Sequence, residues 1–107
     1  MDPSGTKQKA SFCAEITDQD RVDFSNISGD LNPLHNSQSY AKEYGFQKPV
    51  LHGAFLCGLV SKMAGMYLPG EECLLHSIKI NFTKPVQTPI KVSISAKIIF
   101  KGFVEFS

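Results

Sequence analysis

The stretch FSNISGDLNPLHNSQSYA, residues 24–41, places a carboxylate, Asp30, five residues before an imidazole, His35. Asn32 and Pro33 stand between them, and neither residue continues a helix. The pattern therefore predicts a bent loop between two helices, and the bend brings Asp30 and His35 together. An acid and a base held close together can move protons to and from a bound water.

Two helices are predicted on either side of this loop. Thr17 is typical of a helix N-cap, and the helix that it opens is ended by Gly29, which tolerates left-handed backbone angles. Asn36 or Ser37 can cap the second helix, which Gly45 ends. The first helix has a narrow apolar face that consists of Val22, Phe24 and Ile27.

The longest helical pattern opens at His52 and Gly53 and runs to about Met66. Apolar side chains cover most of its circumference, which is typical of a buried helix. Gly58 and Gly65 weaken a helix intrinsically, so we expect another element to pack closely against them. A sheet wrapped around the helix would do this.

Alternating apolar and polar residues predict strands in most of the remaining chain. The clearest alternation covers residues 90–100, and shorter ones cover residues 10–16, 78–82 and 103–106. Such alternation is typical of an antiparallel sheet with one buried face. The expected fold class is therefore α+β, with an antiparallel sheet curled around a central buried helix.

Length and composition limit the classes of protein that fit. The chain has 107 residues and a formal net charge of +1, so we expect one domain, residues 10–107, that follows a disordered polar tail, residues 1–9. The scattered lysines argue against a nucleic-acid partner. No apolar run is long enough to cross a membrane, and the first residues lack the apolar segment of a signal peptide. Three cysteines without metal-ligand spacing favour a reduced, intracellular setting. We expect the cytoplasm, and the mitochondrial matrix stays open as an alternative.

The residues around Asp30 and His35 also resemble a known family. The run FSNISGDLNPLH, with Ala41 six residues further on, is similar to the hydratase signature of MaoC-like proteins, which include the (R)-specific enoyl-CoA hydratases. The resemblance covers about residues 12–98 and implies a hot-dog fold and a homodimer. It continues through Tyr40, Gly45, Phe46, Pro49, Val50, His52, Gly53, Leu56, Gly58, Leu59, Ser61, Gly65, Leu68, Pro69, Gly70, Phe82, Pro85 and Val86.

The resemblance implies a role for individual residues. Asp30 and His35 match the catalytic pair that holds the water added at C3 of a trans-2-enoyl thioester, and which of them acts as the base stays open. Asn32 matches a residue that braces the loop. The Gly53 backbone N–H matches the donor to the thioester carbonyl oxygen, where enolate charge builds during hydration. No metal or organic cofactor is implied.

His52 and Ser61 are further candidates for substrate binding, and each has a plainer interpretation. His52 can be a structural histidine, and Ser61 can be a backbone-bonded hydroxyl or a polar group of the pocket. His76 is expected in the core or in a pocket wall. A zinc site built from His52, Cys57 and His76 is disfavoured.

The resemblance implies an enzyme of fatty-acid metabolism that hydrates enoyl thioesters of CoA or acyl-carrier protein, or dehydrates 3-hydroxyacyl thioesters. Family members continue for further strands beyond Ser107, so we expect a sheet without its C-terminal strands. Either the sequence is a piece of a longer protein or a partner chain covers the exposed edge. Two alternatives stay open: a non-catalytic module that binds thioesters or dimerises, and the hydratase segment of a larger multidomain enzyme.

Overall fold

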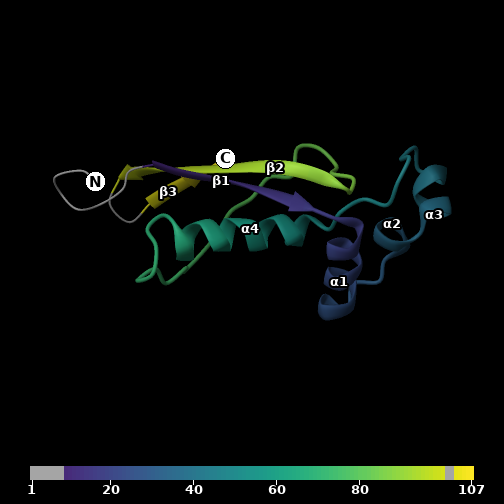
Figure 1. The fold of residues 1–107 in the computed structure, drawn as a ribbon, viewed down its shortest axis with the longest axis horizontal. Coiled ribbons are helices and arrows are strands. Elements are labelled where there is room, and N and C mark those ends of the chain that lie inside the picture. The colour runs from purple at the N-terminus through teal and green to yellow at the C-terminus, as the bar shows by residue number, and fades with distance from the viewer. Residues whose placement is uncertain (1–8, 101–102) are drawn as a thin grey trace. The chain divides into compact units, whose positions relative to one another are not determined.

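The computed structural model describes residues 9–100 and 103–107. The chain divides into two compact units, and the elements are labelled in Figure 1. The predicted tail lies outside the described residues except for Lys9, which begins the first strand. The first unit comprises Met1–Ala14, Leu56–Ile80 and Ser93–Ser107, and the second comprises Glu15–Phe55 and Asn81–Val92.

Three of the four predicted strands are confirmed. They are β1 (Lys9–Ile16), β2 (Ile90–Phe100) and β3 (Phe103–Phe106), and they form one sheet with the order β1-β2-β3. Strand β3 runs antiparallel to β2, with Ala96 opposite Phe106. Ser107 extends this pairing, because it exchanges two backbone hydrogen bonds of 2.6 Å with Ser95.

The core of the first unit lies between this sheet and helix α4 (Gly53–Met66). Its buried residues are Met63, Leu68 and Ala96, and the ring of Phe12 stacks on that of Tyr67 with the centroids 5.1 Å apart. The Lys62 ammonium lies 4.5 Å from the centre of the Phe12 ring, a distance at which the cation is attracted to the ring face. The sheet and the second half of α4 therefore share one small core.

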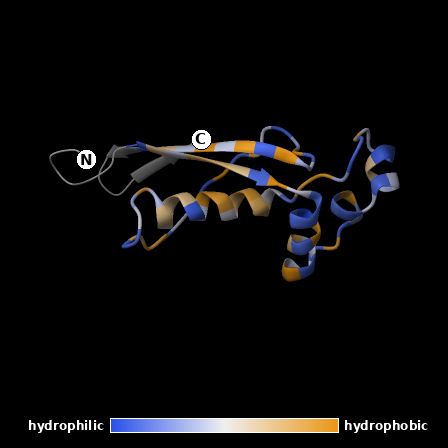
Figure 2. Cartoon of the chain, in the orientation of Figure 1, coloured by the Kyte–Doolittle hydropathy of each residue, from blue (hydrophilic) through white to orange (hydrophobic). Residues whose placement is uncertain are grey.

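The prediction that α4 is buried nearly all round is wrong for this chain. Met63 and Ala64 are its buried residues, whereas Met66 is 74% exposed. A Cβ atom built on Gly58 or Gly65 would meet nothing within 4 Å. Figure 2 shows that α4 is largely apolar. Such a helix becomes buried on all sides when a sheet surrounds it. The described strands leave part of α4 uncovered.

The strand predicted over residues 78–82 is also absent. The segment is irregular, and Ile78 and Phe82 are 43% and 58% exposed. Alternation in the sequence encodes which face of a strand is apolar, but a strand also needs a neighbour that pairs with its backbone. Among the described residues, this segment has no such neighbour.

Three helices belong to the second unit: α1 (Asp18–Ser28), α2 (Pro33–Asn36) and α3 (Gln38–Glu43). Thr17 caps α1 in a reciprocal pair of bonds, because its hydroxyl accepts from the Asp20 N–H at 3.0 Å and its own N–H donates to the Asp20 carboxylate at 2.8 Å. Ser37 caps α3. Over residues 9–100 and 103–107, the helices are too short or too polar to cross a bilayer.

Candidate active site

The loop after α1 is bent by local bonds that the sequence encodes. Gly29 ends α1 with a φ of 77°, an angle that side-chain-bearing residues avoid. The Asn32 N–H donates to Asp30 Oδ1 at 3.2 Å, and Asn32 Oδ1 caps α2 by accepting from the Leu34 N–H at 2.9 Å. Pro33 is the first residue of α2, where its missing N–H costs nothing. The predicted loop therefore contains a four-residue helix that carries His35.

Asp30 and His35 face each other across this loop. Asp30 Oδ2 lies 3.8 Å from His35 Nε2, and the two side chains are 49% and 17% exposed. His35 Nδ1 lies 2.7 Å from the Val50 carbonyl oxygen, which can only accept, so Nδ1 carries a hydrogen. A neutral His35 therefore presents the lone pair of Nε2 to Asp30. The 3.8 Å separation is too long for a direct hydrogen bond and fits a bridging water.

His52 is buried next to this pair, with only 2% of its surface exposed. Its ring stacks on that of His35 with the centroids 4.0 Å apart. Its Nε2 lies 3.2 Å from the Asp30 carbonyl oxygen and 3.0 Å from Ser25 Oγ, and among the described residues its Nδ1 has no hydrogen-bond partner. Burial lowers the pKa of His52, so the neutral ring is favoured, and the carbonyl bond places its hydrogen on Nε2.

Asp30, His35 and His52 offer atoms within 4.8 Å of one another that could ligate a metal. However, the two imidazole rings are inclined by only 26°, and the lone pair of an imidazole nitrogen lies in the plane of its ring. Two such stacked rings direct their lone pairs along nearly parallel planes, not toward one ion about 2 Å from each nitrogen. The geometry therefore fits a proton-transfer site better than a metal site.

Gly53 is the first residue of α4, so its N–H has no acceptor within the helix. Among the described residues, no group accepts a hydrogen bond from it. A Cβ atom on Gly53 would lie 2.9 Å from Cζ of Phe82, so glycine allows the Phe82 ring to lie against the start of the helix. Gly53 belongs to the same unit as Asp30 and His35.

The remaining candidates from the sequence lie in the first unit. Ser61 belongs to α4, and its side chain is exposed. The expectation that His76 lies in the core or in a pocket wall is wrong, because it is exposed in the irregular segment after α4. That segment forms no strand, so it has no sheet face that could bury the imidazole.

The sequence did not predict the buried residues of α1 that support the Asp30–His35 pair. The predicted apolar face of α1 is largely exposed, with Ile27 at 86%, whereas Arg21 and Ser25 are buried. Arg21 Nη1 donates to the His35 carbonyl oxygen at 2.6 Å, and Arg21 Nε donates to Thr88 Oγ1 at 3.1 Å. The available signal was the spacing of the two polar residues, four apart on one helix face.

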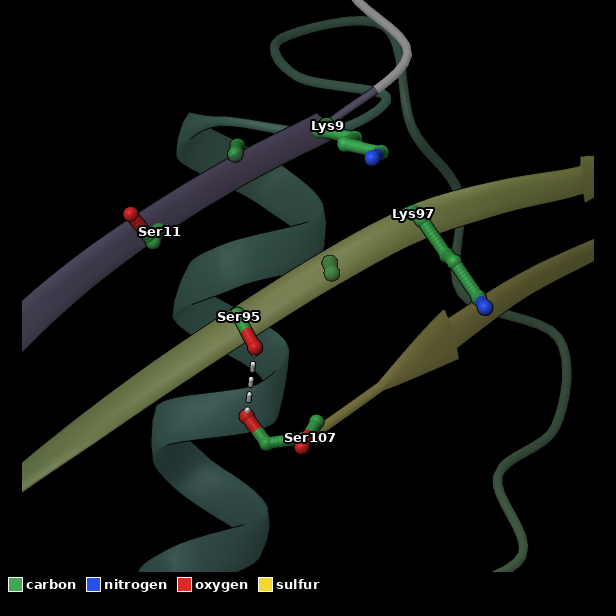
Figure 3. Close-up of a pocket in the computed structure, with 7 residues that line it drawn as sticks. Lys9, Ser11, Ser95, Lys97 and Ser107 are labelled. Carbon is green, nitrogen blue, oxygen red and sulfur yellow. Dashed lines mark hydrogen bonds between the residues drawn. The ribbon is translucent and has the colours of Figure 1, made fainter.

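A separate open hollow of about 540 Å³ lies on the sheet (Figure 3). The Ser95 hydroxyl in this hollow points toward the carbonyl oxygen of Ser107. None of Asp30, His35 and His52 lines it, and its walls are mostly short side chains. The lining residues are Lys9, Ala10, Ser11, Ser95, Ala96, Lys97 and Ser107.

Comparison with known proteins assigns the family. Residues 2–101 match the model of the MaoC like domain, so the chain belongs to the MaoC-like family. It shares the hot-dog fold of solved hydratases. The (R)-hydratase from A. caviae involved in PHA biosynthesis aligns with a TM-score of 0.80 and 28% identity, over 87% of this chain and 70% of that one. R-hydratase PhaJ1 from Pseudomonas aeruginosa aligns with a TM-score of 0.82 over 90% of this chain and 62% of that one.

Two curated relatives are similar in sequence. The 3-hydroxybutyryl-CoA dehydratase of Methylorubrum extorquens is 38% identical over 73 residues, which are 68% of this chain and 46% of the relative. The (R)-specific enoyl-CoA hydratase of Aeromonas caviae is 32% identical over 79 residues, 74% of this chain and 59% of the relative. The chain thus spans about half of the length of these relatives.

Proposed function

We propose that the chain hydrates trans-2-enoyl thioesters to (R)-3-hydroxyacyl thioesters, or catalyses the reverse dehydration. The observation that carries the proposal is the facing pair of Asp30 Oδ2 and His35 Nε2, 3.8 Å apart without a direct bond. With His35 in its neutral form both atoms are acceptors, so one water can donate a hydrogen bond to each of them. The names of the relatives support CoA thioesters as the substrate class.

The proposed reaction follows from these positions. The oxygen of the shared water attacks C3 of the enoyl group while Asp30 or His35 takes one of its protons. The resulting enolate collects a proton at C2 from the same pair of residues, so the elements of one water are added across the double bond. The His35 ring keeps its orientation because Nδ1–H stays bonded to the Val50 carbonyl oxygen.

Negative charge builds on the thioester carbonyl oxygen as the enolate forms. The Gly53 N–H at the start of α4 is a suitable donor, because it has no acceptor within the helix and the helix dipole favours negative charge there. Such donors act strongly when they are fixed before the reaction. Asp30, His35 and Gly53 thus supply a proton-transfer pair and a charge-stabilising amide.

Asp30→Asn and His35→Gln test the proposal. Each variant is expected to lower kcat for crotonyl-CoA hydration by about 10²- to 10⁴-fold, because each replaces one proton acceptor by an amide that cannot act as a base. The measurement is the loss of ultraviolet absorbance of the conjugated enoyl thioester, followed by chiral analysis of the hydrolysed product. Asp23→Asn is the matched control, since Asp23 is an exposed carboxylate of α1 whose side-chain partner among the described residues is Gln19.

Wild-type activity in both Asp30→Asn and His35→Gln would refute the assigned pair. A folded wild-type chain that binds crotonyl-CoA without turnover would favour a non-catalytic thioester-binding module. Formation of the (S) product would refute the stereochemical part of the proposal.

We extend the proposal to a homodimer that acts in fatty-acid metabolism on CoA or carrier-protein thioesters. The family resemblance supports the homodimer, and sedimentation equilibrium of the purified chain would refute it by giving the monomer mass. Three free cysteines, Cys13, Cys57 and Cys73, agree with a reducing compartment such as the cytoplasm. Microscopy of the tagged protein in its native cell tests that location.

A further inference from the structure

We propose that Arg21 is a positioning residue that fixes the His35 segment through its backbone carbonyl. This inference rests on the proposed function, because it concerns the same pair of side chains. Arg21 Nη1 donates to the His35 carbonyl oxygen at 2.6 Å, which is shorter than the 3.1 Å bond from Arg21 Nε to Thr88 Oγ1. Arg21 lies 14 residues before His35, so the contact ties helix α1 to α2.

The other end of the guanidinium is anchored by a chain of polar groups. Arg21 Nε donates to Thr88 Oγ1 at 3.1 Å, and the Thr88 hydroxyl donates to Asp18 Oδ1 at 2.7 Å. Thr88 is only 1% exposed, so its hydroxyl needs these partners. A planar guanidinium fixed at Nε has little freedom at Nη1, and the His35 carbonyl is therefore held in one place.

Burial of the Arg21 guanidinium is hard to explain by a contribution to folding stability alone. Arg21 is only 7% exposed, and burying a charge is costly unless an opposite charge compensates it closely. Among the described residues, the carboxylate that pairs with Arg21 is that of Asp18, whose Oδ1 lies 3.8 Å from Nη2 and whose side chain is 56% exposed. The shortest contact of this cation is instead a neutral carbonyl that belongs to a candidate catalytic residue.

The same face of α1 supports the other member of the pair. Ser25, one turn after Arg21, is buried, and its hydroxyl lies 3.0 Å from His52 Nε2. The same nitrogen lies 3.2 Å from the Asp30 carbonyl oxygen. Helix α1 thus reaches the carbonyl of His35 through Arg21 and that of Asp30 through Ser25 and His52. This buried polar face fixes the separation between the two reacting side chains.

Arg21→Met tests the inference, since methionine keeps much of the stem and removes every donor. We expect kcat for crotonyl-CoA to fall by about 10- to 100-fold while KM stays near the wild-type value, because misplacing an acid or base slows the chemical step more than binding. Arg21→Lys should recover part of kcat, since an ammonium keeps the charge and donors but lacks the rigid planar fork of the guanidinium. Gln19→Met on the exposed side of α1 is the matched control and should keep wild-type kcat.

A second measurement does not depend on turnover. The His35 Nδ1–H proton, bonded to the Val50 carbonyl, can be observed by ¹⁵N-edited NMR, and Arg21→Met should speed its exchange with solvent relative to Gln19→Met. If the wild-type chain proves inert, the proposed function fails while this comparison still decides the role of Arg21. Wild-type exchange together with wild-type kcat in Arg21→Met would overturn the inference.

If Arg21→Met does not fold, Thr88→Val tests whether Arg21 positions His35. Valine has the shape of threonine but cannot bond Arg21 Nε or Asp18, so the guanidinium loses its anchor while the charge remains. We expect kcat to fall by about tenfold with an unchanged KM, and a wild-type kcat in this variant would overturn the inference.

Discussion

Gly53 combines two properties that a single substitution can separate. Its N–H has no acceptor among the described residues, and its missing Cβ leaves room for the Phe82 ring, whose Cζ would lie 2.9 Å from a Cβ at this position. Alanine restores the Cβ and keeps the N–H. Proline adds a similar bulk at the first helical position, where its backbone angle is tolerated, but it removes the N–H.

We therefore expect Gly53→Pro to lower kcat by about 10²- to 10³-fold relative to Gly53→Ala, the typical loss on removing one donor to a developing oxyanion. The difference between the two variants isolates the hydrogen bond, because both crowd Phe82. Steady-state rates with crotonyl-CoA and circular dichroism of each variant supply the comparison. Equal rates in the two folded variants would show that another group stabilises the enolate.

At the scale of a helix, α1 is the element on which the site depends most. Its N-terminus is closed by the reciprocal bonds of Thr17 and Asp20, and its buried side carries Arg21 and Ser25. Figure 2 shows that α1 is largely polar, so its capping contributes more to its stability than an apolar face can.

Thr17→Ala is expected to destabilise the chain by about 1 kcal/mol, because the Asp20 N–H loses its acceptor. Urea unfolding followed by circular dichroism measures the shift of the midpoint. Thr83→Ala is the matched control, since Thr83 is exposed in an irregular segment. An unchanged midpoint in Thr17→Ala would mean that the bond to the Thr17 hydroxyl does not stabilise the start of α1.

Local chemistry made several elements predictable from the sequence. The cap at Thr17, the stop at Gly29 and the start of α4 depend on residues within one helical turn, so a short stretch encodes them. The long alternation of β2 was equally readable. The bent loop that brings Asp30 and His35 together follows from Asn32 and Pro33, whose side-chain bonds and ring close it locally.

Features that depend on contacts between residues far apart in the sequence could not be predicted. Arg21 and Thr88 are 67 residues apart in the sequence, and the residues around Arg21 do not predict that it has a buried polar partner. The apolar stripe of α1 suggested the wrong face, because buried polar pairs are recognised only once their acceptors are in place. Residues 78–82 have the pattern of a strand, but a neighbouring strand decides whether they form one.

At the scale of the whole molecule, the titration of His52 makes the folding stability depend on pH. Burial lowers the pKa of His52 in the folded chain, with further contributions from His35 and Arg21, against the bond to the Asp30 carbonyl that raises it. In the unfolded chain His52 titrates near its ordinary value of about 6.5. The unfolded state therefore binds more protons than the folded state just below that pH, and stability rises with pH in this range.

We expect the thermal midpoint of the wild-type chain to be constant above about pH 7.5 and to fall as the pH drops through about 6.5 toward the lower pKa of folded His52. His52→Gln cannot acquire a charge, so its midpoint should be lower at pH 8 but flatter between pH 7.5 and 5. His76→Gln, at an exposed histidine, is the control and should follow the wild-type curve. Differential scanning calorimetry across this range makes the comparison. A wild-type slope that survives in His52→Gln would assign the pH dependence to other groups, because this variant removes the titration of His52.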